Sequence, residues 1–135
     1  MTIFMLDTDI CSYILKNHPV YLREVFNSHY HNHAVCISTV TYAELMAGAM
    51  RSGSIRLQEK IFDFTSLLEV SDWTVSCARQ YAIVQTALLN SGMPIGNMDA
   101  MIAAAALAID ATLVTNNEKH FSYSSRIISY YTASH

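Results

Sequence analysis

The sequence carries little charge for its length and has no long apolar run. Charged residues make up 14% of the 135 residues, and the formal net charge is −3. Tight sequence-independent binding to nucleic acid depends on a basic surface, so this charge balance argues against it. The net charge is still compatible with an enzyme that uses acids to hold a metal ion and a local basic patch to bind nucleic acid. No apolar run reaches the roughly 18 residues that a membrane-spanning helix needs.

The sequence has only three cysteines. Cys11, Cys36 and Cys77 are odd in number and far apart, which fits neither a disulfide framework nor a zinc site. We therefore expect three buried, reduced thiols. The N-terminus lacks the basic region, long apolar core and small-residue cleavage site of a signal peptide, so we expect a cytoplasmic protein without a membrane partner.

The remaining composition favours a folded globule. Apolar residues make up 52% of the chain, which is more than a disordered chain usually contains. The length suits one domain with a core of ordinary size. No repeat, linker or low-complexity segment divides the chain. We therefore predict a single domain over residues 1–135.

Short apolar segments alternate with segments of helical periodicity. Strands are predicted at residues 3–6, 34–37, 69–72, 112–115 and 126–130. Helices are predicted at residues 8–16, 20–30, 39–52, 54–68, 74–89 and 98–108. Strands separated by helices indicate a mainly parallel sheet covered on both faces, which is a three-layer α/β/α sandwich.

Several finer features follow from residue type. Thr8 or Asp9 is the expected N-cap of the first helix, Ser38 or Thr39 of the third, and Asn97 of the last. In the helix over residues 54–68, the expected inward residues are Ile55, Ile61, Phe62 and Leu68. The turn with His29, His31 and His33 is interpreted as a solvated loop, because no acid or cysteine accompanies it at metal-ligand spacing.

Four polar residues follow strands or begin helices in this scheme. Asp7 ends the first strand, Asn117 follows the fourth, and Asp99 lies in the first turn of the helix between them. Glu44 lies in the second turn of another helix. Since parallel strands direct their carboxyl ends to one edge of the sheet, Asp7, Asp99 and Asn117 are expected to converge in one crevice.

Each acid alone has an ordinary structural explanation. Asp7 can cap a strand end, Glu44 can be an exposed helix acid, and Asp99 can be a helix-dipole partner. Together, converging carboxylates repel one another unless a cation neutralises them. Oxygen ligands without cysteine or histidine point to Mg²⁺ or Mn²⁺. Such ions bind phosphates and activate water, which predicts phosphoryl chemistry.

Over nearly all of its length the chain resembles the PIN-domain ribonucleases of the VapC toxin family. The likeness is carried by three segments: MLDTDICSYILK at 5–16, ISTVTYAELMAGA at 37–49, and GMPIGNMDAMIAAAALAIDATLVTNNEKHF at 92–121. The first and third are specific signatures, and the second is looser. The resemblance implies that Asp7, Glu44 and Asp99 coordinate the catalytic metal, with Thr115 supporting the site by hydrogen bonding.

The resemblance also implies a biological role. Members of this family are toxins of type II toxin–antitoxin systems that cleave RNA, often tRNA, and thereby inhibit translation and growth. They are blocked by a VapB-type antitoxin and are usually homodimers within a toxin–antitoxin hetero-oligomer. We therefore expect the same reaction, a homodimer and the same kind of antitoxin partner here.

Two positions depart from the family pattern. Many members have an acid where this chain has Asn117, which can ligate through its carbonyl oxygen but brings no charge. The missing charge disfavours tight binding of a second metal ion, although Asp9, often Asn in relatives, can recover part of that charge. Ala47 replaces the family's usual Tyr and can loosen packing beside Glu44 or alter a dimer contact.

Two other functions compete with this interpretation. Asp7-Thr8-Asp9 after an apolar strand also resembles the opening of aspartyl-phosphate phosphohydrolases of the haloacid dehalogenase type, where the first Asp is the nucleophile. That fold needs a later Lys and an acid pair after suitable strands, which are missing here. The other candidate is a non-catalytic nucleic-acid-binding PIN module, which becomes attractive if Asn117 prevents metal binding.

The basic residues are few and scattered. Lys16 and Lys119 follow the elements that deliver Asp7 and Asn117, so both are candidates for RNA-phosphate contacts at the rim of the crevice. The alternative is that they are ordinary solvated charges. A dimer would join two such rims into a longer positive track.

Overall fold

The computed structural model describes residues 2–16, 34–92, 96–115 and 127–129. Its strands form one five-stranded sheet in the order β3-β2-β1-β4-β5, and every neighbouring pair is parallel. The predicted parallel sheet is thus confirmed. The strands are β1 (Ile3–Leu6), β2 (Ala34–Ser38), β3 (Glu69–Ser71), β4 (Thr112–Thr115) and β5 (Ile127–Ser129).

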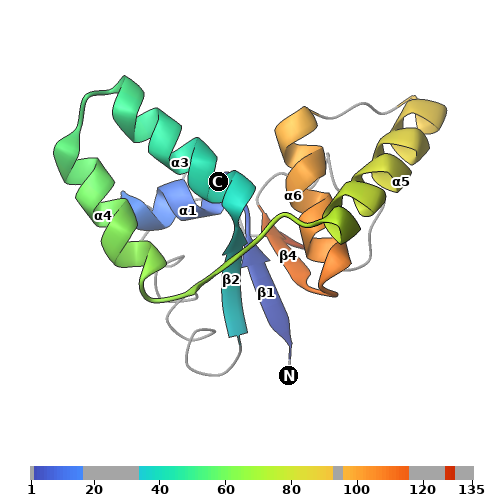
Figure 1. Cartoon of the computed structure of the whole chain (residues 1–135), viewed down its shortest axis with the longest axis horizontal. Helices are drawn as coiled ribbons and strands as arrows, with labels where there is room; N and C mark the ends of the chain where they lie inside the picture. The colour runs from blue at the N-terminus through green and yellow to red at the C-terminus, as the bar shows by residue number, and fades with distance from the viewer. Residues whose placement is uncertain (1, 17–33, 93–95, 116–126, 130–135) are drawn as a thin grey trace.

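Helices cover both faces of this sheet (Figure 1). On one side lie α1 (Thr8–Leu15), α3 (Thr39–Arg51) and α4 (Ile55–Thr65), and on the other side lie α5 (Val75–Ser91) and α6 (Asn97–Ala108). The three-layer α/β/α architecture is therefore confirmed. The helix predicted for residues 20–30, the three histidines beside it, Asn117 and Lys119 lie outside the described residues.

Alternation along the central strand explains why an apolar core lies on each face of the sheet. In β1, Phe4 and Leu6 pack with α1, α3 and α4, whereas Met5 packs with α6 on the opposite face. Successive side chains of a strand point to opposite faces, so an all-apolar strand supplies both cores. Leu113 and Val114 in β4 divide in the same way. The central strands therefore hold the two helical layers together.

The helix caps confirm one prediction and correct two. Ser38 caps α3 by accepting a hydrogen bond from the Val40 N–H at 3.1 Å, as predicted. The cap of α1 is Asp7, not Thr8 or Asp9, because its Oδ1 already accepts from the Ile10 N–H. The cap of α6 is Gly96, without a side-chain bond, and Asn97 is the first helical residue.

The prediction for the inward face of α4 is wrong for two of its four residues. Ile61 and Phe64 are buried, with Leu68 partly buried beyond the helix end, whereas Ile55 and Phe62 are 66% and 71% exposed. The buried residues recur at spacings of three and four, which places them on one helical face. Ile55 and Phe62 are seven residues apart, so they share a second apolar face that this core does not cover.

The cysteines lie in the cores as expected. Cys11, Cys36 and Cys77 are buried and free, so none of them forms a disulfide. Burial raises the pKa of the Cys36 thiol to about 12, with a smaller contribution from the negative charge of Glu69. A thiol is an effective nucleophile only as the thiolate, so burial makes Cys36 a poor nucleophile. Among the described residues, no helix is long and apolar enough to cross a membrane.

Candidate active site

The site is built around Asp7, the residue that follows β1. The register of β1 and β4 pairs Leu6 with Val114, so the next residues of the two strands, Asp7 and Thr115, lie side by side. The Asp7 N–H donates to the Val114 carbonyl at 3.1 Å. The Thr115 hydroxyl donates to Oδ2 of Asp7 at 2.5 Å, while Oδ1 accepts from the Ile10 N–H at 2.9 Å. Both carboxylate oxygens therefore have fixed hydrogen-bond donors.

Burial makes this carboxylate unusual. Asp7 is only 4% exposed, and loss of hydration raises its pKa to about 7 from an ordinary 3.8. The hydrogen bonds from Thr115 and Ile10 oppose this rise, while the negative charges of Asp9 and Asp99 add to it. A buried acid with carboxylates nearby is strongly perturbed, which is typical of functional sites. A bound cation would favour the charged form of this carboxylate and reduce its repulsion with the neighbouring acids.

Glu44 reaches the site through Thr8, the first residue of α1. The Thr8 hydroxyl donates to Oε1 of Glu44 at 2.6 Å, across 36 positions of sequence. Because β1 and β2 are parallel neighbours, the helices that follow them, α1 and α3, begin at the same sheet edge. Sequence reasoning treated Thr8 only as a possible cap and missed this contact. The signal was present, since Thr8 lies between the two aspartates of the first motif.

Asp99 approaches from the opposite helical layer. It is half-buried in the first turn of α6, and its charge acts on Asp7. The start of α6 is tied to α5, because Oδ1 of Asn97 accepts from Nε2 of Gln85 at 3.3 Å. Deeper in the helix, the Trp73 indole N–H donates to the Met101 carbonyl at 3.0 Å. These contacts hold the helix that carries Asp99.

The donor set fits a hard divalent cation, although it is not assembled into a compact cage. Asp7 and Asp99 interact electrostatically, and Glu44 is bonded to the residue next to Asp7. Within the described ranges, no three His, Cys, Asp or Glu side chains are grouped closely enough to form a ready-made metal site. Oxygen donors, a buried carboxylate and like-charge repulsion favour Mg²⁺ or Mn²⁺, ions that commonly keep several water ligands.

The remaining candidate residues are more exposed. Asp9 is exposed on the first turn of α1, and Lys16 is exposed at the end of that helix.

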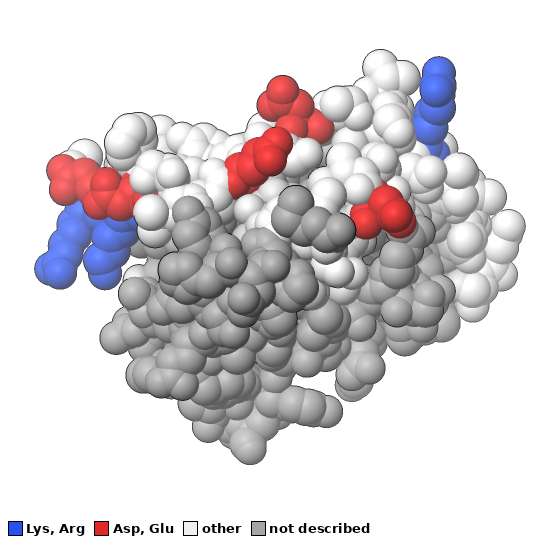
Figure 2. Space-filling view, turned by 90° about the horizontal axis from the view of Figure 1, so that it is seen from below, with Lys and Arg blue, Asp and Glu red and all other residues white. Residues whose placement is uncertain are grey.

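Figure 2 views the molecule from the end where β1 begins, opposite to the edge that carries Asp7. On the described part of this face, acidic side chains are spread out and the Lys and Arg side chains lie toward its two ends, without forming a continuous basic patch.

A family model of the PIN domain matches residues 4–124. Ribonuclease VapC2 of Rickettsia felis is 39% identical over 120 residues, covering 88% of this chain and 90% of that protein. The tRNA(fMet)-specific endonuclease VapC of Shigella flexneri is 36% identical over 119 residues, covering 87% of this chain and 89% of that protein.

Solved structures agree with the sequence relatives. The crystal structure of VapBC2 from Rickettsia felis, bound to a promoter DNA fragment, contains a chain with TM-score 0.85 and 36% identity, covering 96% of this chain and 98% of its own. A chain in the VapBC-1 structure from nontypeable Haemophilus influenzae has TM-score 0.83 and 32% identity, covering 96% and 97%.

These matches define the class of protein. The site lies in a PIN domain, and the relatives that cover most of the chain are VapC ribonucleases. The chain therefore belongs to the VapC family of PIN-domain proteins. The match favours the PIN interpretation of Asp7-Thr8-Asp9 over the haloacid dehalogenase one.

Proposed function

We propose that this chain is the endoribonuclease toxin of a VapBC-type toxin–antitoxin system, acting in the cytoplasm as a single PIN domain. The observation that carries the proposal is the state of the Asp7 carboxylate. It is buried at a strand end, two hydrogen-bond donors fix its oxygens, and burial raises its pKa to about 7. Such a group is costly for a fold to keep, because burying a charge is unfavourable unless it is paired. A function that needs the carboxylate explains why it is there.

Asp7, Asp99 and Glu44 would hold a Mg²⁺ or Mn²⁺ ion, with Asp9 and Asn117 as supporting groups. When bound, such an ion supplies a Lewis acid and lowers the pKa of water that attacks a phosphodiester. The chain's own contribution is to place the carboxylates. Thr115 and the Ile10 N–H orient the two oxygens of Asp7, and Asp7 would release its proton when it binds the cation. Because Asp7 is almost completely buried, its carboxylate has little contact with bulk water before a cation binds.

The substrate proposed is RNA, and tRNA in particular, because the Shigella flexneri relative is named a tRNA(fMet)-specific endonuclease. Cleavage of tRNA would inhibit translation and growth. Lys16 and Lys119 are proposed to contact phosphates, and Lys16 is exposed just after α1. Contacts of this kind position the RNA without selecting its sequence.

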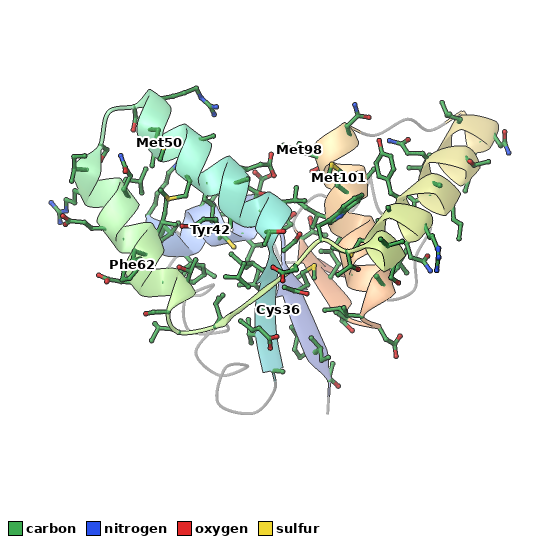
Figure 3. The ribbon with its side chains drawn as sticks, in the orientation of Figure 1. Cys36, Tyr42, Met50, Phe62, Met98 and Met101 are labelled. Carbon is green, nitrogen blue, oxygen red and sulfur yellow. The ribbon has the colours of Figure 1, made fainter. Side chains whose placement is uncertain are left out.

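A VapB-type antitoxin is the proposed partner, because similar chains occur in VapBC complexes. An apolar groove between α3 and α4 suits an amphipathic segment of that antitoxin. Its volume is about 450 Å³, and its lining is Tyr42, Met46, Ile55, Gln58, Glu59, Phe62 and Asp63. Figure 3 shows Tyr42 and Phe62 on these two neighbouring helices. The carboxylates at Glu59 and Asp63 favour a segment with basic residues beside its apolar ones. We also propose that two copies of this chain form a homodimer within the toxin–antitoxin complex.

The decisive experiment uses the purified chain and total tRNA. We expect new RNA ends to form with Mg²⁺ or Mn²⁺, and to be absent with a chelator or in the Asp7→Asn variant. Release of phosphate from small phosphomonoesters would instead support the haloacid dehalogenase alternative. Binding of RNA without any cleavage, with the metal present, would support the non-catalytic module.

A further inference from the structure

The hydrogen bond between Thr8 and Glu44 links two elements that meet only in the folded chain. Thr8 opens α1 and Glu44 lies in α3. The distance of 2.6 Å between Oγ1 and Oε1 is within the usual range for a hydroxyl that donates to a carboxylate, and both side chains are partly buried. A hydrogen bond to an ionised carboxylate is about twice as strong as a neutral one. The bond is therefore well suited to fix one orientation of the Glu44 side chain.

Thr8 is itself held in place by its neighbour. Asp7 precedes it, and the Asp7 backbone is bonded to β4 while the Asp7 side chain caps α1. The Thr8 hydroxyl is thereby fixed relative to the Asp7 carboxylate. In contrast, Glu44 has three side-chain torsions, so holding it in one orientation without a partner is entropically unfavourable. The Thr8 hydroxyl offsets that cost before any ligand arrives.

We propose that Thr8 is a positioning residue that holds the Glu44 carboxylate in the orientation required for divalent-cation binding beside Asp7. The inference rests on the proposed function, because it takes the cation as the ligand. Through Thr8, Glu44 is tied to the same turn of chain as Asp7, although it comes from another helix. With Oε1 engaged by the hydroxyl, Oε2 is the oxygen available to face the cation or one of its waters.

The test compares three versions of this residue by Mn²⁺ titration calorimetry, which reads metal binding independently of cleavage. Thr8→Val keeps the shape of the side chain and removes the hydroxyl. Loss of a group that orients a metal ligand costs 10–100-fold in affinity, so we expect Thr8→Val to weaken Mn²⁺ binding about tenfold. Thr8→Ser restores a hydroxyl at the same position and is expected to bind within about twofold of the wild type.

A matched control makes the same chemical change elsewhere. Thr86 is an exposed helical threonine on α5 whose hydroxyl donates to the Ala82 carbonyl at 2.8 Å. Thr86→Val is expected to leave Mn²⁺ affinity unchanged. Circular dichroism and thermal unfolding show whether each variant is folded. If Thr8→Val fails to fold, the comparison of Thr8→Ser with Thr8→Asn, which retains polarity but misplaces the donor, gives the same test.

A double-mutant cycle shows whether Thr8 acts through Glu44. Glu44→Gln should weaken Mn²⁺ binding, and adding Thr8→Val to it should cause little further loss, because the residue being positioned has already lost its charge. Independent, additive losses would contradict the proposal. So would unchanged Mn²⁺ affinity in folded Thr8→Val.

These outcomes are separable from those that test the ribonuclease proposal. If the wild type binds Mn²⁺ and cleaves RNA while Thr8→Val binds the ion equally well, only the positioning role is wrong. If the wild type binds Mn²⁺ with the predicted dependence on Thr8 but cleaves no RNA, only the proposed function is wrong. Absence of Mn²⁺ binding by the wild type would overturn both.

Discussion

The Thr115 hydroxyl donates a 2.5 Å hydrogen bond to Oδ2 of Asp7, although the two residues are 108 positions apart. The pairing of Leu6 with Val114 in neighbouring parallel strands brings them together. This bond and the one from the Ile10 N–H favour the charged form of Asp7, while burial favours the neutral form more strongly. The carboxylate is consequently fixed in position and close to its titration point near neutral pH.

The first prediction concerns how stability depends on pH without metal. The folded-state pKa of Asp7 is about 7 and the ordinary value is 3.8, so the folded protein binds the proton more tightly than the unfolded chain does. The free energy of unfolding should therefore fall, by up to a few kcal/mol, as pH rises from about 4 to above 7. Asp7→Asn should remove this slope and abolish RNA cleavage.

Urea denaturation in a chelator, at several pH values, measures this difference. Asp72→Asn is the control, because Asp72 is an exposed acid outside the site. A wild-type slope equal to that of Asp7→Asn would show that Asp7 titrates normally. Full RNA cleavage by folded Asp7→Asn would remove this residue from the mechanism.

The second prediction concerns Thr115. Thr115→Val removes a hydrogen bond that lowers the pKa of Asp7, so the pKa should rise further above its ordinary value. RNA cleavage should then need a higher pH, because proton and cation compete for the same oxygens. Carbon-13 NMR of the Asp7 carboxyl measures the pKa directly. Thr115→Ser should behave like the wild type, and Thr112→Val on the same strand serves as the control.

The third prediction concerns Asp99. Its negative charge raises the pKa of Asp7, so Asp99→Asn should move that pKa downward toward the ordinary range. The same variant should lose most RNA cleavage if Asp99 holds the cation, whereas Glu44→Gln should be milder because Glu44 can act through a metal-bound water. An Asp7 pKa that does not change in Asp99→Asn would mean that the two carboxylates are not coupled in solution.

The fourth prediction concerns the groove between α3 and α4. Phe62 is 71% exposed and lines this groove, so Phe62→Ser should cost little stability. We expect it to weaken binding of the cognate antitoxin at least tenfold, measured by calorimetry, while RNA cleavage is retained. Leu89→Ser is the matched control, because Leu89 is equally exposed on α5, outside the groove. If both variants bind the antitoxin with equal affinity, the antitoxin does not bind in the groove between α3 and α4.

The fifth prediction concerns Lys16, which is exposed at the end of α1. If it contacts an RNA phosphate, Lys16→Ala should weaken binding of all RNAs and reduce the slope of log affinity against log salt by about one. The cleavage position should not move. Lys60→Ala, on the exposed side of α4, provides the comparison. If Lys16→Ala leaves the salt slope unchanged, Lys16 does not contact an RNA phosphate and is an ordinary solvated charge.

The sequence by itself determined the elements and the layering. The four-residue apolar run before Asp7 predicts a strand covered on both faces, and the structure divides Phe4, Met5 and Leu6 between two cores as that prediction requires. The predicted cap of α3 at Ser38 is also confirmed. These features depend on local preferences and on the two-residue period of a strand, both of which are encoded in neighbouring residues. The sequence also predicted that Asp99 would lie near Asp7, because the helix that leads into a parallel strand begins at the edge where the strands end, and the charge of Asp99 does act on Asp7.

Only the tertiary structure decided which apolar face of α4 is buried and which partner each polar group takes. Ile61 and Phe62 are adjacent and equally suited to a core, yet one is buried and the other lines a groove. Periodicity identifies apolar faces, but the position of α1 and α3 selects the one that is covered. Likewise, the bonds from Thr8 to Glu44 and from Thr115 to Asp7 depend on strand order and register. Contacts between distant residues form only when the whole sheet is assembled, so local sequence could not specify them.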